Sequence, residues 1–135
     1  MSPLRHREFL RFCMVGFLAF LVDSSLLELL VYTGLTAPVA RGLSIAVALQ
    51  CSYFLHGAFT FRAHGGYSIK SWMKFMLGNL MGAALNYGVF LLVLMAQVGA
   101  DARIARLAAL LAGTAVALLF NYWASRRFVF ARREP

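Results

Sequence analysis

Residues 41–62 read RGLSIAVALQCSYFLHGAFTFR, and this stretch decides the fold class. Twenty residues without Asp, Glu, Lys or Arg lie between Arg41 and Arg62. A helix needs about twenty predominantly apolar residues to cross the hydrocarbon core of a bilayer. The whole chain has the same character, because 61% of its 135 residues are hydrophobic and only 13% are charged. The composition predicts a polytopic membrane protein and excludes disorder, a disulfide scaffold and an ordinary soluble enzyme.

Three further apolar stretches have the length of a membrane span. With charged residues taken as boundaries, the predicted spans are residues 12–32, 42–61, 75–98 and 107–125. The connections are short, and the first contains the helix breaker Pro38. The first stretch carries Asp23 and Glu28 and lacks a small-residue cleavage site, which favours a span over a secretion signal. We predict an all-α membrane protein in which residues 1–135 form one domain of four transmembrane helices.

The basic residues predict the orientation of these spans. Four spans place both termini on one side of the membrane. That side holds ten Lys and Arg residues: Arg5, Arg7, Arg11, Arg62, Lys70, Lys74, Arg126, Arg127, Arg132 and Arg133. The other side holds three: Arg41, Arg103 and Arg106. The positive-inside rule then predicts that both termini are cytoplasmic. Flanking residues of this kind explain the net charge of +8, and no pattern indicates nucleic-acid binding.

The two halves of the sequence resemble each other. A shift of 63 residues places Arg11-Phe12 on Lys74-Phe75 and Asp23 on Asn86. A shift of 69 residues aligns 44–61 with 113–130, with seven identities in eighteen positions. Each half has two spans, so the prediction is two helical hairpins related as a parallel repeat about an axis along the membrane normal. Stripes of small residues, such as Ala105, Ala109, Gly113 and Ala117, predict close helix packing.

Asp23 is the polar residue that most needs an explanation. It lies twelve residues after Arg11, or about 18 Å along a helix, beyond the middle of the bilayer. An aspartate at the centre of a span costs about 2.5–3.5 kcal/mol on insertion scales. Asn86 and Gln50 lie at comparable depth. Two readings stay open, a buried carboxyl bonded to Asn86 or Gln50, and a role in substrate binding or proton transfer.

The candidate substrate-binding residues form three levels. Asp23, Gln50, Asn79, Asn86 and Asn121 lie within the spans, Glu28 lies near the outer end, and Lys74, Arg126 and Arg127 lie on the inner side. Glu28 fits an ion pair with the outer arginines or a polar vestibule. The inner cations fit a lipid-phosphate site, because guanidinium groups bind phosphate well, or ordinary topology anchoring.

Several classes of chemistry have no matching pattern. The cysteines and histidines show no metal-ligand spacing, and no nucleophile–base pair or carboxylate dyad is visible. No GxxxxGK[ST] motif occurs, so this chain is not expected to use ATP. We therefore expect no metal, no cofactor and no enzymatic activity.

Four stretches together form a recognisable pattern: residues 11–16 (RFCMVG) leading to Asp23, 52–61 (SYFLHGAFTF), the stretch from Lys74 to Asn86, and 121–130 (NYWASRRFVF). In the order and spacing of these stretches, the sequence resembles the GtrA-like family of small four-span bacterial membrane proteins. Family members commonly have an Asn-Arg pair before the aromatic ending. Here the pairs are His56-Gly57 and Ser125-Arg126, so only Arg126 keeps the basic member.

The resemblance implies a role in cell-surface polysaccharide synthesis at the bacterial cytoplasmic (inner) membrane. Family members are associated with transfer of polyprenyl-phosphate-linked sugars across that membrane and with the glycosyltransferases that make those lipids. The first hypothesis is a nucleotide-independent translocase, which we expect to be a homodimer because four helices enclose little room.

Two alternatives belong to other classes. The chain could anchor or organise a polyprenyl-phosphate glycosyltransferase. It could also be a proton-coupled exporter like the small multidrug resistance family, whose dimers are often antiparallel. The ten-to-three charge bias argues against that last arrangement.

Overall fold

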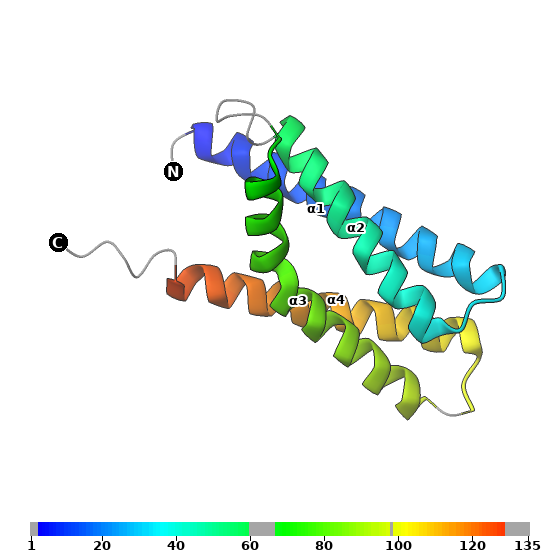
Figure 1. Ribbon diagram of the computed structural model, residues 1–135. Coiled ribbons are helices and arrows are strands. Elements are labelled where there is room, and N and C mark those ends of the chain that lie inside the picture. Colours follow the sequence, from blue (N-terminus) through cyan, green and yellow to red (C-terminus); the bar gives the residue numbers. More distant parts are fainter. Residues whose placement is uncertain (1–2, 60–66, 98, 129–135) are drawn as a thin grey trace. The chain divides into compact units, whose positions relative to one another are not determined.

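Four α-helices build the part of the chain that the computed structural model describes, residues 3–59, 67–97 and 99–128 (Figure 1). They are α1 (Pro3–Tyr32), α2 (Ala37–Phe59), α3 (Ile69–Ala96) and α4 (Ala102–Phe128). Each contains a segment long and apolar enough to cross a membrane: Cys13–Tyr32, Ala37–Ala58, Ile69–Ala96 and Ala102–Asn121. The prediction of an all-α membrane protein with four transmembrane helices is confirmed.

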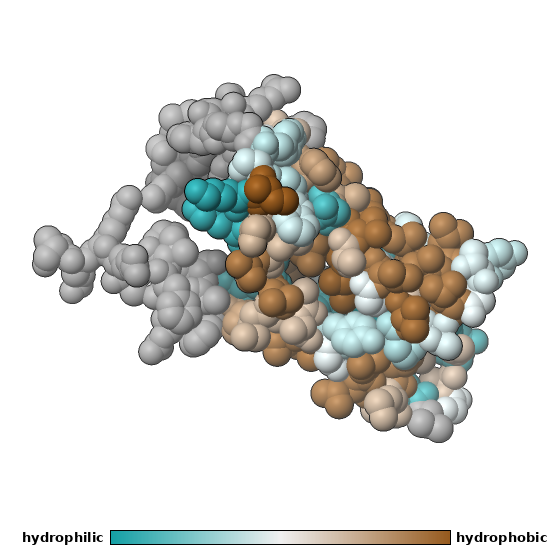
Figure 2. Space-filling view, viewed as in Figure 1, coloured by the Kyte–Doolittle hydropathy of each residue, from teal (hydrophilic) through white to brown (hydrophobic). Residues whose placement is uncertain are grey.

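The outer surface of these helices is apolar, as a lipid-facing surface must be. Large side chains such as Phe17 on α1, Leu92 on α3 and Leu119 on α4 are 61%, 69% and 70% exposed. Hydrophobic residues cover much of the visible described surface in Figure 2. In water, exposed apolar surface of this extent would promote aggregation, whereas in a membrane the acyl chains of the lipids cover it.

The chain divides into two compact units, Met1–Gly78 and Asn79–Pro135. The first unit contains the hairpin of α1 and α2, which pack along each other, and the first turns of α3 (Figure 1). The second unit contains the remainder of α3 together with α4. The polar residues of interest are described below unit by unit.

A glycine C-cap ends α1. Gly34 has a φ of +103°, its N–H donates to the Val31 carbonyl oxygen at 3.0 Å, and the N–H of Leu35 donates to the Leu30 carbonyl oxygen at 3.1 Å. These two bonds form a Schellman motif, in which glycine adopts the positive φ without a steric cost. Gly99, which follows α3, also has a positive φ, of +92°.

Replacing Gly34 with alanine should therefore destabilise the first hairpin. Side chains disfavour positive φ by roughly 1–2 kcal/mol, and no neighbouring atom compensates, because a Cβ at Gly34 would contact nothing within 4 Å. Gly16→Ala is the matched control, since Gly16 lies inside α1 with equally open surroundings. Denaturant titration in detergent, followed by circular dichroism, measures both; equal stability of the two variants would contradict the C-cap assignment.

Pro38 begins a helix instead of breaking one, which corrects the prediction for the first connection. α2 starts at Ala37, and the N–H of Ala40 donates to the Thr36 carbonyl oxygen at 2.9 Å. Proline is tolerated in the first turn of a helix, where its missing N–H has no partner to lose. Arg41 is consequently one turn inside α2, whereas the predicted span begins after it.

α3 and α4 also begin before the predicted spans, which started at residues 75 and 107. Ser68 and Ser71 cap α3 reciprocally, each side-chain oxygen accepting the other's backbone N–H at 3.1 and 3.3 Å. The Asp101 carboxylate caps α4 by accepting the N–H groups of Arg103 and Ile104 at 2.9 and 3.2 Å. Charged side chains do not end a helix, because its backbone hydrogen bonds continue beneath them. Phe61 and Val98, the predicted ends of two spans, lie outside the described residues.

Candidate functional site

A buried ion pair joins α1 to α2 in the first unit. Nη1 of Arg41 donates to Oδ1 of Asp23 at 2.7 Å, and the Arg41 side chain is 0% exposed. Ser44, also 0% exposed, lies one turn further along α2. Its hydroxyl oxygen lies 3.5 Å from Nη1 of Arg41, and this hydroxyl donates to the Arg41 carbonyl oxygen at 3.0 Å. A cation, a carboxylate and a hydroxyl thus meet within apolar helices.

The positions along the two helices determine which way Arg41 extends. Asp23 lies nine residues before the end of α1, or about 14 Å from the turn, while Arg41 lies about 6 Å from the start of α2. The guanidinium therefore extends from the end of the hairpin toward its middle to meet the carboxylate. Arginines near the ends of spans usually extend the other way, toward the membrane surface.

Stability alone does not explain such a pair. Removing two charges from water costs several kcal/mol per ion, and well-packed apolar residues of similar volume often stabilise a protein as well or better. Breaking the pair by removing one member is nevertheless costly, because the other charge is left buried. Ionisable residues are rare within membrane spans, so the pair is a candidate functional site.

A second polar cluster ties the far end of α2 to the start of α3. The Tyr53 hydroxyl lies 2.6 Å from the Ser71 hydroxyl and donates to the Ser68 carbonyl oxygen at 3.3 Å. Nε1 of Trp72 donates to Oε1 of Gln50 at 2.8 Å. The ring of Tyr53 also meets the ring of Phe75, with centroids 5.6 Å apart. These contacts fix the first turns of α3 against α2.

In the second unit, amides pack against glycines. A Cβ on Gly113 of α4 would lie close to two oxygen atoms of Asn86 on α3. It would be 2.5 Å from the backbone carbonyl oxygen and 2.8 Å from the side-chain Oδ1. A Cβ on Gly82 of α3 would lie 2.7 Å from Oδ1 of Asn121 on α4. The two helices therefore approach each other as closely as glycine allows. The small-residue stripe of α4 is buried as predicted, with Ala105, Ala109 and Ala117 at most 8% exposed.

The two hairpins place equivalent positions together. A shift of 63 takes Asp23 to Asn86, and a shift of 69 takes Ser44 to Gly113. Asp23 and Ser44 both lie near Nη1 of Arg41 in the first unit, while Asn86 lies against Gly113 in the second. The matched positions come from the sequence, and the parallel repeat stays a prediction.

The family comparison agrees with this architecture. The family model for the GtrA/DPMS transmembrane domain matches residues 11–130. The chain belongs to this family. Neither the curated proteins nor the solved structures compared with it gave a significant match.

For this GtrA/DPMS chain, the predicted site residues separate into distinct environments. Asp23 bonds to Arg41, whereas Gln50, one of the two partners predicted for Asp23, bonds to Trp72. Asn86 and Asn121 lie at the α3–α4 contact. Asn79, the first residue of the second unit, and Glu28 on α1 are both half-buried.

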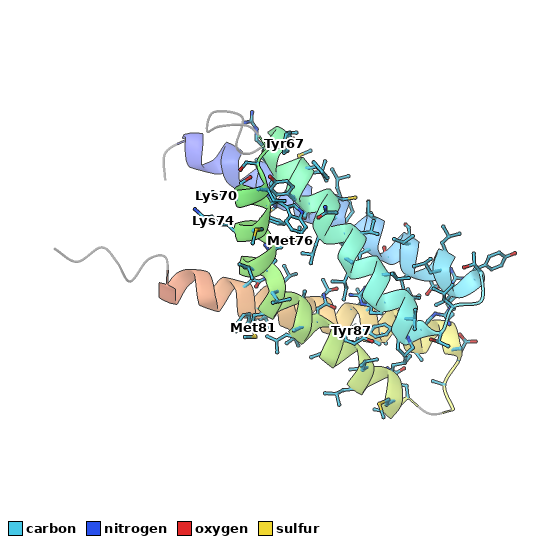
Figure 3. All side chains as sticks on the ribbon, in the orientation of Figure 1. Tyr67, Lys70, Lys74, Met76, Met81 and Tyr87 are labelled. Carbon is cyan, nitrogen blue, oxygen red and sulfur yellow. The ribbon has the colours of Figure 1, made fainter. Side chains whose placement is uncertain are left out.

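The predicted inner cations are described only in part. Lys70 and Lys74 are exposed one turn apart on α3, and Figure 3 shows both side chains projecting from its first turns. Arg126 and Arg127 belong to α4, but their side chains are not among those described, and Arg62 lies outside the described residues. Among the described residues, no group of three or more His, Cys, Asp or Glu could hold a metal ion.

Arg41 is absent from the predicted site, because span boundaries predicted from charge place every arginine outside the helices. A signal was present in the sequence. Thr36, Ala37 and Pro38 form a typical helix start, with a capping residue followed by proline in the first turn. A helix that begins there carries Arg41 and Ser44 on one face, since they are three residues apart.

Proposed function

We propose that this GtrA/DPMS-family protein moves a polyprenyl-phosphate-linked sugar across the membrane. The observation that carries the proposal is the buried Asp23–Arg41 pair between two membrane-spanning helices. An anionic lipid headgroup needs charged partners inside the bilayer, and ionisable residues at that depth commonly mark transport pathways. Membership of the family supports the choice of substrate class. In this proposal the protein is a transporter, performs no chemistry on its substrate and needs no cofactor.

The proposal includes a setting for the protein. It places both termini in the cytoplasm of a bacterium, because the ten-to-three distribution of Lys and Arg follows the positive-inside rule. It also includes a homodimer in the inner membrane, since four helices enclose little space for a sugar.

The experiment is reconstitution of the purified protein into liposomes with a labelled polyprenyl-phosphate sugar. The movement of label between leaflets should exceed that of protein-free liposomes and should fall to that background in Asp23→Asn. Ser24→Ala is the matched control, because the Ser24 hydroxyl donates to its own helix at the Leu21 carbonyl oxygen, 3.2 Å away. Movement unchanged in a folded Asp23→Asn protein would refute this pathway.

A second candidate function is a membrane anchor for a glycosyltransferase. The exposed Lys70 and Lys74 at the start of α3 favour it, because they offer a basic surface to a partner outside the bilayer (Figure 3). The same liposome experiment separates the two functions. A folded wild-type protein that moves no lipid would favour the anchor.

A further inference from the structure

The side chain of Arg41 is held in an unusual direction for its position. It lies in the second turn of α2, from which the polar surface of the membrane is within reach. Instead, its Nη1 bonds to Asp23 at 2.7 Å, deeper in the hairpin, and the side chain is 0% exposed. The Arg41 guanidinium is thus held inside the membrane, where the Asp23 carboxylate compensates its charge.

We propose that Arg41 binds the phosphate of the lipid-linked sugar, and that Asp23 is the counter-ion that Arg41 exchanges for that phosphate. This inference rests on the proposed function and names the group that recognises the substrate. Binding and release then become a competition between two anions, one carried by the protein and one by the lipid, for the same guanidinium.

The chemistry of the three side chains fits an exchange of this kind. A guanidinium offers planar pairs of N–H donors that match carboxylate and phosphate oxygens alike. Exchange keeps Arg41 paired both with and without ligand, which avoids the large cost of an isolated buried charge. The Ser44 hydroxyl, 3.5 Å from Nη1 of Arg41, lies where a bound anion would meet it.

Asp23 has a specific part in this exchange, which is to release the ligand. The carboxylate returns to Arg41 when the phosphate leaves, so it lowers the affinity and speeds the departure of the lipid. A protein without this carboxylate should bind phosphate more tightly and transport it less. A merely structural ion pair predicts a different result, in which its loss weakens binding and transport together.

The test measures binding by the full-length protein in lipid nanodiscs. The probes are a short-chain polyprenyl phosphate, the uncharged polyprenol of the same length, and inorganic phosphate. Asp23→Asn should bind the polyprenyl phosphate at least about tenfold more tightly than the wild type, as expected when an internal competitor occupies Arg41 nine-tenths of the time or more. Its transport of the labelled lipid in liposomes should be lost. Ser24→Ala should match the wild type in both measurements.

A second variant decides the matter if Asp23→Asn fails to fold. The double variant Asp23→Leu/Arg41→Met has no charge to bury, and it should fold yet lose at least about tenfold in affinity for the polyprenyl phosphate, the usual scale for a charge-assisted hydrogen bond. Its affinity for polyprenol should not change. Arg41→Lys should retain part of the phosphate binding, because it keeps the positive charge without the planar fork.

The outcomes separate this inference from the proposed function. A wild-type protein that moves the lipid, together with a double variant that binds and moves it equally well, would overturn the role of Arg41 and leave the proposed function standing. A wild-type protein that neither binds nor moves the lipid would overturn both. Equal affinity for inorganic phosphate and polyprenyl phosphate would overturn the lipid as the source of the anion.

Discussion

Replacing Arg41 with methionine should lower the free energy of unfolding by about 3–5 kcal/mol, because it leaves the Asp23 carboxylate buried without its cation. Asp23 is 7% exposed, so neighbouring solvent offers little compensation. Asp23→Leu should have an effect of similar size for the complementary reason. These are the largest single-residue effects that we expect in the first unit.

The double variant Asp23→Leu/Arg41→Met should recover most of the lost stability. Its two apolar side chains replace the pair without leaving a charge, and such replacements are often neutral or stabilising. Unfolding of all four proteins in detergent completes a double-mutant cycle that isolates the coupling between the two residues. Single variants within about 1 kcal/mol of the wild type, the range of surface ion pairs, would show that the pair is not buried in the folded protein.

Gly113→Ala should be the most damaging alanine substitution among the helix glycines whose surroundings are described. The new Cβ would lie 2.5 Å from the backbone carbonyl oxygen of Asn86, and a helix backbone cannot move aside without separating α3 from α4. Overpacking of this kind typically costs 1–3 kcal/mol, and we expect a value of about 3. Gly82→Ala should cost less, because it meets the exposed side chain of Asn121, which can rotate.

Gly88→Ala is the matched control for this prediction. Gly88 lies in α3, as Gly82 does, yet a Cβ there would contact nothing within 4 Å. Alanine should then leave stability unchanged or raise it by up to about 1 kcal/mol through its better helix propensity. Thermal unfolding of the three variants in one detergent gives the order, and a Gly113→Ala protein as stable as Gly88→Ala would contradict the close α3–α4 contact.

The helices were predictable from the sequence because their signal is local and strong. A predominantly apolar run without Asp, Glu, Lys or Arg, such as residues 42–61, can satisfy its backbone in lipid only as a helix. The small-residue stripe from Ala105 to Ala117 was predictable for a similar reason, since spacing of four residues places side chains on one face. Burial of that stripe in α4 confirmed the prediction.

The partners of the polar residues were not predictable in the same way. Depth along a span suggested Asn86 or Gln50 for Asp23, but depth gives no rotation of one helix against another. Gln50 lies on the part of α2 that meets Trp72, while Arg41 and Ser44 lie on the part that meets α1. A long side chain adds a further uncertainty, because Arg41 spans a difference of about 8 Å in depth between its own backbone and that of Asp23.

The buried pair also bears on how the protein enters its membrane. Asp23 belongs to α1, which is synthesised before α2, the helix that carries Arg41. During synthesis α1 therefore reaches the lipid with a carboxylate whose partner has not yet been made, at an insertion cost of about 2.5–3.5 kcal/mol for an aspartate near the centre of a span. The Schellman turn at Gly34 brings α2 back at once, with only four residues between the end of α1 and the start of α2. We expect the two helices to leave the insertion machinery together as one hairpin, in which Arg41 of α2 pairs with the Asp23 carboxylate of α1.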